Sequence, residues 1–206
     1  MNHTVIHSQK RPDLLDHIEK EYGYISFRGV YDINLIVTRN PENNFNKFDD
    51  QLHLIFVHNN NLWCHCIYPC TADPGRYHLN NPGRVEGTAI VKSPQQLRGA
   101  YTFGRHKGRY ECLVPRVPIP VWRDSNRDSV YDHDGDFFGY GINIHRSTSS
   151  GISHLVDRWS AGCIVLASSE SYAHFLGILK KQPQYGHGKN FTFTIIDKEN
   201  YETTSN

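Results

Sequence analysis

The sequence predicts a mainly β protein, a β-rich α+β domain, and two observations support this class. Short runs of β-branched and aromatic residues recur between residues 24 and 143, and most are bounded by clusters of Asn, Gly, Pro or Asp. Strands of that length with turn signals between them are typical of a mostly antiparallel sheet. The predicted strands are Asn34 to Thr38, Leu52 to Val57, Leu62 to Tyr68, Gly87 to Val91, Glu111 to Val114 and, near the end of the chain, Phe191 to Ile195.

Two helices are expected to flank the strands. In residues 12–23 the apolar side chains share one helical face and a glycine supplies the stop. A second helix is expected to begin at Ser168, whose hydroxyl can cap it, because apolar residues follow at helical spacing. We therefore expect one domain over residues 1–206, with a helical extension over 1–23 and a frayed tail over 201–206.

The charge and hydropathy of the chain argue against two classes of partner. The 206 residues carry 22 Lys and Arg against 21 Asp and Glu, a formal net charge of +1, besides 13 His. This balance argues against a nucleic acid held by a broad basic face. The mean hydropathy is −0.58, and no apolar run approaches the roughly 18 residues of a membrane-spanning helix. We expect no membrane span.

The first eight residues lack the basic segment and apolar segment of a Sec signal. We therefore expect synthesis in the cytosol, where thiols are kept reduced. The number of cysteines is odd, so they cannot all pair with one another. They are Cys64, Cys66, Cys70, Cys112 and Cys163.

The strongest chemical signal is one histidine together with one cysteine. His145 ends an alternating apolar run, whereas Cys163 follows a Ser-Ala-Gly turn and precedes an apolar run. A cysteine nucleophile needs a nearby imidazole to accept its proton. It also needs backbone N–H groups aimed at the developing oxyanion, and Gly162 permits the close backbone approach that provides them. A Cys163 nucleophile with a His145 base meets these needs.

This segment resembles the signature of the L,D-transpeptidase (YkuD-type) family. His145 is followed by fourteen residues and then by Ser160-Ala161-Gly162-Cys163, whereas the family carries a His, a similar spacer and Ser/Thr-His-Gly-Cys. Upstream, the segment from Thr71 to Tyr77, Thr-Ala-Asp-Pro-Gly-Arg-Tyr, resembles the family's Thr-Pro-x-Gly-x-Phe/Tyr turn. The likeness extends over residues 52–179.

The resemblance implies an L,D-transpeptidase-like β-sandwich with one helix after the nucleophile. It implies that Cys163 is the nucleophile and His145 its base, and that the carbonyl of Arg146 holds the imidazole tautomer. It also implies that the N–H groups of Gly162 and Cys163 form the oxyanion hole, and that the reaction requires no cofactor.

Two positions depart from the family pattern. The histidine that precedes the glycine in the family is Ala161 here, and the Asn or Arg two residues after the nucleophile is Val165. Both positions line the substrate cleft of the family, so the departures bear on acceptor choice and activity. Arg146 and Arg158 are our candidates to replace the lost polar contact by clamping a carboxylate of the stem peptide.

Simpler structural roles stand beside these chemical ones. Cys163 could be a core thiol, since Cys is among the most buried residue types. Ser160, counted with the catalytic motif, is expected to form the turn or cap an N–H rather than to act as a nucleophile. Trp159 and Tyr140, with Arg158, are candidates for substrate binding, and packing in the core or at the rim is the alternative for the two aromatic residues.

Residues 63–70 have a partial zinc-site pattern, Cys-x-Cys-x3-Cys with a histidine. On a strand, however, Cys64 and Cys66 face one side and His65 faces the other. No second ligand pair completes a tetrahedral site, so we expect structural thiols here.

Asp124, Asn126 and Asp128 fall at positions 1, 3 and 5 of a calcium-loop pattern, and Val130 can offer a carbonyl at position 7. Position 6 is Ser instead of Gly, and position 12 is Gly instead of Glu. A structural calcium site and a plain acidic hairpin loop are both open interpretations.

The expected function is that of a cysteine enzyme acting on peptidoglycan stem peptides through a thioester on Cys163. An amine acceptor gives transpeptidation, and water gives L,D-carboxypeptidase or endopeptidase activity; the missing signal and the altered cleft favour hydrolysis. A phage lysis enzyme (an endolysin) or an injected effector, acting in the periplasm or cell wall after release or injection, fits cytosolic synthesis. The alternatives are a non-catalytic wall-binding or virion component that retains the fold, and a cysteine protease or amidase with another substrate.

Overall fold

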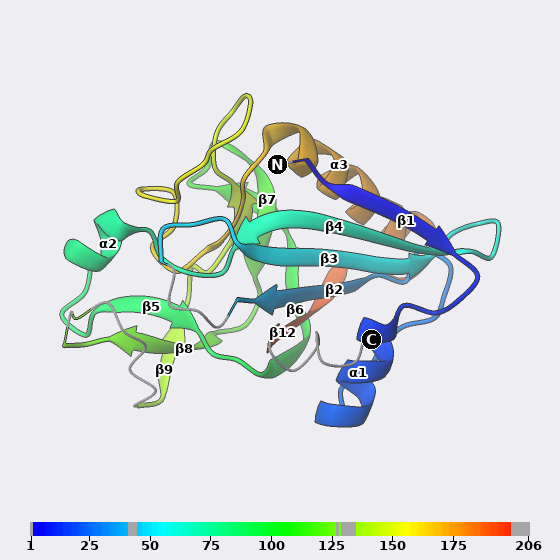
Figure 1. The fold of residues 1–206 in the computed structure, drawn as a ribbon, viewed down its shortest axis with the longest axis horizontal. Helices are drawn as coiled ribbons and strands as arrows, with labels where there is room; N and C mark the ends of the chain where they lie inside the picture. Colours follow the sequence, from blue (N-terminus) through cyan, green and yellow to red (C-terminus); the bar gives the residue numbers. More distant parts are fainter. Residues whose placement is uncertain (1, 41–44, 127, 129–134, 199–206) are drawn as a thin grey trace.

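The computed structural model describes residues 2–40, 45–126, 128 and 135–198, and its largest feature is a sheet that closes on itself. In the described residues this sheet has nine strands in the order β1-β4-β11-β10-β7-β6-β12-β2-β3, and β3 also pairs with β4. The last pairing closes the strands from β4 to β3 into a ring around the main core and leaves β1 as an extra strand on β4 (Figure 1). The strands are β1 (Thr4–Ser8), β2 (Asn34–Arg39), β3 (Asp50–Val57), β4 (Trp63–Thr71), β6 (Gln95–His106), β7 (Tyr110–Pro115), β10 (Ile144–Arg146), β11 (Ile164–Leu166) and β12 (Asn190–Asp197).

A smaller sheet lies beside the large one, at the lower left of Figure 1. It consists of β5 (Thr88–Val91), β8 (Ile119–Asp124) and β9 (Phe137–Gly139), in the order β5-β8-β9. Its inward side chains, among them Val91, Ile119 and Val121, join the main core. The small sheet is therefore fixed to the large one by apolar packing.

The helices are α1 (Asp13–Tyr22), α2 (Arg76–Asn80), α3 (Ser169–Leu179) and α4 (Lys181–Gln184). In α1, buried Leu14, Leu15 and Ile18 pack with isoleucines of β2, β3 and β12 in a second core. Gly23 ends α1 in the left-handed conformation, with a φ of 66°. The hydroxyl of Ser168 accepts a hydrogen bond from the Ser171 N–H (3.3 Å) and so caps α3.

The mainly β class, the mostly antiparallel pairing and the two expected helices are confirmed; α2 and α4 are short additions. Only β10–β11 and β12–β2 are parallel among the paired strands of the described residues. The predicted strands are present, most of them slightly longer than expected, although β5 begins one residue later than predicted and is shorter. Strands β1, β6, β8, β9 and β11 were not predicted. The twelve-residue β6 contains two glycines and three basic residues, which mask the strand signal. The predicted tail, 201–206, lies outside the described residues.

In the part of the chain that the structure describes, every helix is too short or too polar to cross a bilayer. The five cysteines are all free thiols. Cys64 and Cys66 point into the main core, whereas His65 faces the opposite side of β4 and contacts His53. The prediction of structural thiols in residues 63–70 is confirmed.

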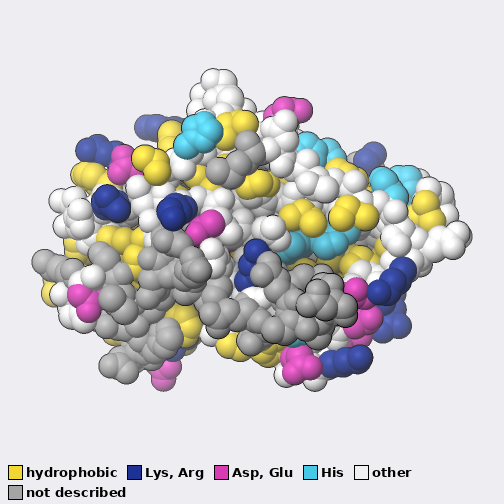
Figure 2. Space-filling model, in the orientation of Figure 1, with side chains coloured by type: hydrophobic (Ala, Val, Ile, Leu, Met, Phe, Trp, Pro, Cys, Tyr) yellow, Lys and Arg dark blue, Asp and Glu magenta, His cyan; other side chains and the backbone are white. Residues whose placement is uncertain are grey.

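Histidine side chains gather on the face of β3 and β4 that Figure 2 shows. Nδ1 of His53 lies 2.9 Å from Nε2 of His65, and Nε2 of His53 lies 3.0 Å from the hydroxyl of Thr38. Burial lowers the pKa of His65 to about 4. Burial, followed by the charge of His65, holds the pKa of His53 well below its usual range. Both imidazoles are therefore neutral in the folded protein at pH 7.

This pair predicts a loss of stability in mild acid. Between pH 6.5 and 4 the unfolded chain binds a proton at His65 that the folded chain does not, so the free energy of unfolding falls as the pH falls. For His65 alone the loss between pH 7 and pH 5 is about 2 kcal/mol. We expect His65→Gln to remove that part of the pH dependence in urea unfolding, whereas His154→Gln, at an exposed position, leaves it unchanged. An equal pH dependence in both variants would contradict the prediction.

Candidate active site

Two parallel strands bring His145 and Cys163 to one face of the sheet. In the pairing of β10 with β11, Ile144 lies opposite Ile164 and His145 lies opposite Val165. Ile144 and Ile164 belong to the main core, whereas Val165 belongs to a separate cluster against which Cys163 packs. Since side chains alternate along a strand, His145 is on the same face as Cys163, two register positions away.

His145 is held in one orientation by its neighbours. It is 2% exposed, and its Nδ1 lies 2.8 Å from the carbonyl oxygen of Arg146. The hydroxyl of Tyr110 lies 3.2 Å from both Nδ1 and that oxygen. A carbonyl only accepts, so Nδ1 carries the proton and Nε2 is the basic atom. Among the described residues Nε2 has no hydrogen-bond partner. The carbonyl of Arg146 thus occupies the place that the resemblance implied.

A second histidine stacks on this imidazole. The ring centroids of His106 and His145 are 3.9 Å apart, and the side-chain amide of Asn143 donates to Nδ1 of His106 (3.1 Å). Burial, followed by the charge of His106, lowers the pKa of His145 to about 3. A proton on His145 is therefore costly unless a negative charge forms beside it.

Cys163 is half-buried, and its thiol lies 3.4 Å from the carbonyl oxygen of Gly141. Burial raises the pKa of Cys163 to about 11, although the backbone N–H of Asn143 and the charge of Lys107 act in the opposite direction. The thiol and the imidazole of the candidate site are therefore both neutral at rest. In such a site the proton has to leave the sulfur as the sulfur attacks, because no thiolate forms beforehand.

Ser160 shapes the turn that precedes the thiol. Its hydroxyl donates to the carbonyl oxygen of Cys163 (2.7 Å) and accepts from the N–H of Gly162 (3.1 Å). The expectation that Ser160 forms the turn is confirmed. The expectation that the Gly162 N–H faces an oxyanion is wrong for this conformation, because that N–H is already bonded to Ser160. The N–H of Cys163 is the remaining donor of the predicted pair.

Gly162 is required at its position for two reasons. Its φ is 112°, which side chains rarely allow, and an added Cβ would lie 2.5 Å from the carbonyl oxygen of Ala89 in β5. The turn therefore packs directly on the small sheet. This contact sets the distance between the turn before Cys163 and the small sheet.

The segment from Thr71 to Tyr77 supports the same turn from the other side. The N–H of Gly75 donates to the carbonyl oxygen of Ser160 (2.9 Å). An added Cβ at Gly75 would lie 2.0 Å from the carbonyl oxygen of Asp157. Only a glycine lets the two loops approach this closely.

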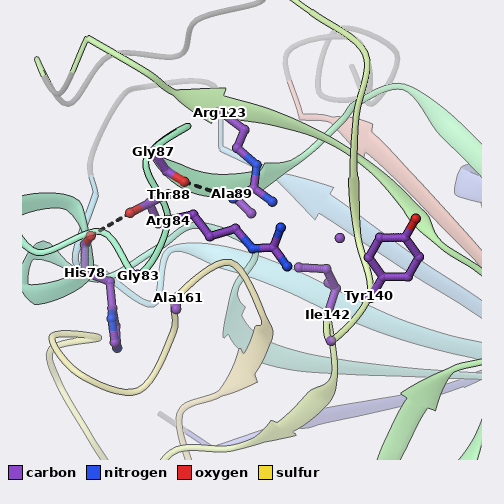
Figure 3. Close-up of a pocket in the computed structure, with 12 residues that line it drawn as sticks. His78, Gly83, Arg84, Gly87, Thr88, Ala89, Arg123, Tyr140, Ile142 and Ala161 are labelled. Carbon is purple, nitrogen blue, oxygen red and sulfur yellow. Dashed lines mark hydrogen bonds between the residues drawn. The ribbon is translucent and has the colours of Figure 1, made fainter.

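Two cavities border the segment that leads to Cys163, one at Arg158 and Trp159 and the other at Ala161. The first, of about 410 Å³, is lined by His145 and by cationic and aromatic side chains that include Lys107, Arg109, Arg146, Arg158 and Trp159. The second, of about 300 Å³, is lined by His78, Arg84, Arg123, Tyr140, Ile142 and Ala161 (Figure 3). None of the described residues that line either cavity is acidic. Both cavities therefore favour anionic ligands.

The predicted binding residues are divided between these cavities. Arg146, Arg158 and Trp159 line the first, and Tyr140 lines the second. Trp159 is 43% exposed and Tyr140 is 71% exposed, so core packing is wrong for both. Arg146 lies over the ring of Tyr110 at 4.3 Å and Arg158 over the ring of Tyr77 at 3.9 Å, so cation–π contacts orient both guanidinium groups.

Four residues of the site were not predicted from the sequence. His106 and Tyr110 flank the turn of the β6–β7 hairpin, which the unpredicted β6 forms. Arg84 and Arg123 meet through a sheet pairing, β5 with β8, that no local pattern reveals. A basic turn, His-Lys-Gly-Arg from His106 to Arg109, was the one available signal.

In the described residues no group of three or more His, Cys, Asp or Glu is arranged to hold a metal ion. Asp124 is buried at the end of β8. Oδ1 of Asn126 accepts from the N–H of Asp128 (3.0 Å), and its amide donates to the Asp128 carboxylate (3.0 Å). Val130 lies outside the described residues. Calcium binding by Asp124, Asn126 and Asp128 stays a prediction.

Comparison of the chain with protein-family models, with curated protein sequences and with solved structures finds no match. The likeness to L,D-transpeptidases therefore depends on the motif residues.

The close approach at Gly75 predicts that Gly75→Ala is destabilising. The new methyl group has to displace the backbone at Asp157, which we expect to cost about 2–3 kcal/mol in urea unfolding. Gly177→Ala is the matched control, because Gly177 is exposed in α3 with open space around it. There the same change is expected to raise stability by up to about 1 kcal/mol. Equal effects at the two positions would contradict the prediction.

The raised pKa of Cys163 predicts the pH profile of its alkylation. We expect the rate of iodoacetamide modification of Cys163, followed by peptide mass spectrometry, to rise about tenfold per pH unit from pH 7 to pH 10. Because the resting imidazole is neutral, His145→Gln should leave this profile unchanged. A rate plateau between pH 6 and pH 8 that His145→Gln abolishes would instead reveal a preformed thiolate–imidazolium pair.

Proposed function

We propose that the protein is a cysteine enzyme of the L,D-transpeptidase type that acts on peptidoglycan stem peptides. The observation that supports this most is the basic Nε2 of His145, unpartnered among the described residues, on the same face as the Cys163 thiol. Its Nδ1 is fixed by the carbonyl of Arg146 (2.8 Å). A nucleophile, a base and a group that orients the base together meet the minimum requirement for acyl transfer.

The proposed reaction assigns one step to each of these groups. The Cys163 sulfur attacks the carbonyl at the L-centre of a diamino acid that precedes a D-residue, and its proton passes to Nε2 of His145. The C–N bond then breaks, His145 protonates the leaving amine, and the acyl group remains on the sulfur as a thioester. Attack by an amine gives a cross-link, and attack by water gives a free carboxylic acid. In either case the incoming group gives its proton to His145, which returns it to the sulfur as the C–S bond breaks.

The low pKa of His145 is consistent with this cycle. The imidazolium is unfavourable at rest, but an oxyanion beside it stabilises the charge while the tetrahedral intermediate exists. Once the oxyanion collapses, the buried imidazolium readily releases its proton to the leaving amine. Burial thus makes His145 a weak base at rest and a strong acid afterwards.

The cationic lining of the His145 cavity fits the substrate class. Among the described residues neither Arg146 nor Arg158 forms an ion pair, and both are oriented by aromatic rings. Planar guanidinium groups that are oriented but not ion-paired can bind the carboxylates of a stem peptide. This supports the proposed clamp that replaces the polar residue lost at Val165.

A non-catalytic wall-binding component is the second candidate. The Gly162 N–H bonded to Ser160 and the raised pKa of Cys163 favour it, since both weaken a nucleophilic site. Such a protein would bind the same peptides without a covalent adduct.

Incubation of the purified protein with muropeptides separates the two candidates. We expect a thioester adduct on Cys163 by mass spectrometry, absent in Cys163→Ala, and formed about 100- to 10,000-fold more slowly in His145→Gln. Cys112→Ala, which removes another buried thiol, should retain the adduct, and thermal unfolding confirms that each variant folds. Saturable binding without adduct or product would support the non-catalytic component, and products released by Cys163→Ala would refute both candidates.

A further inference from the structure

The cavity lined by Gly141 and Ala161 contains two converging guanidinium groups. Arg123, on β8, is 6% exposed, and its Nη1 donates to the carbonyl oxygen of Gly87 (2.9 Å). Arg84 comes from the loop before β5, and Figure 3 shows both side chains reaching into the same space above Ile142. Burial, followed by the charge of Arg84, lowers the pKa of Arg123. Two like charges are thus held together at the cavity.

Within the described part of the chain, no carboxylate forms an ion pair with Arg84 or Arg123. The charge of Glu86 raises the pKa of Arg123, but none of the ion pairs of the described residues joins Glu86 to either arginine, and Glu86 does not line the cavity. Converging guanidinium groups without a protein carboxylate form a site for an external anion.

The remaining lining limits the kind of anion. Ala89, Ile142 and Ala161 give the cavity an apolar wall beside its two arginines. A small carboxylate with a short aliphatic substituent matches this lining better than an inorganic anion does. Ala161 stands where the motif of the resembled family has a histidine, and a larger side chain at this position would enter the cavity.

The lining also fixes the position of this cavity relative to Cys163 and His145. Gly141, whose carbonyl oxygen lies 3.4 Å from the Cys163 thiol, is part of its lining. His145 lines the other cavity. Since His145 protonates the leaving amine, the leaving group has to lie on its side, and the acyl group that stays on the sulfur extends toward the arginines.

We propose that Arg84 and Arg123 bind a carboxylate on the acyl part of the substrate, the part retained on Cys163. The proposal rests on the function proposed above and narrows it to acyl donors that carry an acidic group and a short aliphatic segment. The two cavities then hold the donor from both sides of the scissile bond, with Arg84 and Arg123 on one side and Arg146 and Arg158 on the other.

Ligand binding by the whole chain tests this without requiring turnover. The probes are N-acetylalanine, its neutral amide N-acetylalaninamide, and inorganic phosphate, each titrated against the ¹⁵N-labelled protein at constant ionic strength. We expect N-acetylalanine to shift the backbone amide signals of Gly83, Gly87, Thr88 and Gly141 in a saturable way. We expect the neutral amide to bind at least about tenfold more weakly.

Two variants assign the effect to the cavity. Arg84→Gln, at an exposed position that does not threaten the fold, should weaken N-acetylalanine binding at least about fivefold, and Ala161→His should block it. Arg146→Gln, which removes a cation from the other cavity, should leave these shifts unchanged. Arg123→Lys keeps the charge but loses the planar fork, so we expect an intermediate loss.

Three outcomes would overturn the proposal: equal binding of N-acetylalanine and its amide, equal or tighter binding of phosphate, or weakening by Arg146→Gln but not by Arg84→Gln. The experiments distinguish failure of the proposed function from failure of this inference. Carboxylate binding at Arg84 without a Cys163 adduct from muropeptides refutes the enzyme and keeps the anion site. An adduct whose rate is the same in wild type and Arg84→Gln keeps the enzyme and refutes the role of the arginines.

Discussion

The parallel pairing of β10 with β11 is the constraint on which the candidate site depends. It sets His145 opposite Val165 and turns both away from the main core, so that the thiol two residues earlier lies on the same face. Each of the two strands has only three residues, and the packing around them supplies the stability that so few backbone hydrogen bonds cannot. Gly75 on one side and the small sheet under Gly162 on the other hold the intervening turn in place.

The electrostatics of the site follow from the same packing. Burial keeps His145 and Cys163 uncharged at rest, while a lysine and several arginines line the two nearby cavities. A neutral reactive pair inside a cationic rim attracts anionic ligands without forming a reactive thiolate in their absence. The positive lining and the protonation states of the pair are thus two results of one arrangement.

The sequence predicted the class of fold and the two helices because amphipathic spacing and turn residues are local signals. The resemblance also pointed to the shared face of His145 and Cys163 and to the contact with the Arg146 carbonyl, because the motif keeps these residues at a fixed spacing. The sequence could not predict the stacking of His106 on His145, or the meeting of Arg84 with Arg123, because each depends on strand pairing between distant segments. The prediction that the Gly162 N–H is an oxyanion donor was wrong for a related reason. A serine hydroxyl placed by the turn satisfies that N–H, and residue types alone do not show where a hydroxyl points.

The edge of β4 has a consequence for self-association. β11 covers only Cys70 and Thr71 on that edge, and β1 covers the stretch from Trp63 to Ile67 by antiparallel pairing. The N-terminal strand therefore occupies backbone donors and acceptors that would otherwise be open to a strand from another molecule. Because β1 pairs only with β4 among the described strands, the open edge of the sheet is moved from β4 to the five residues of β1.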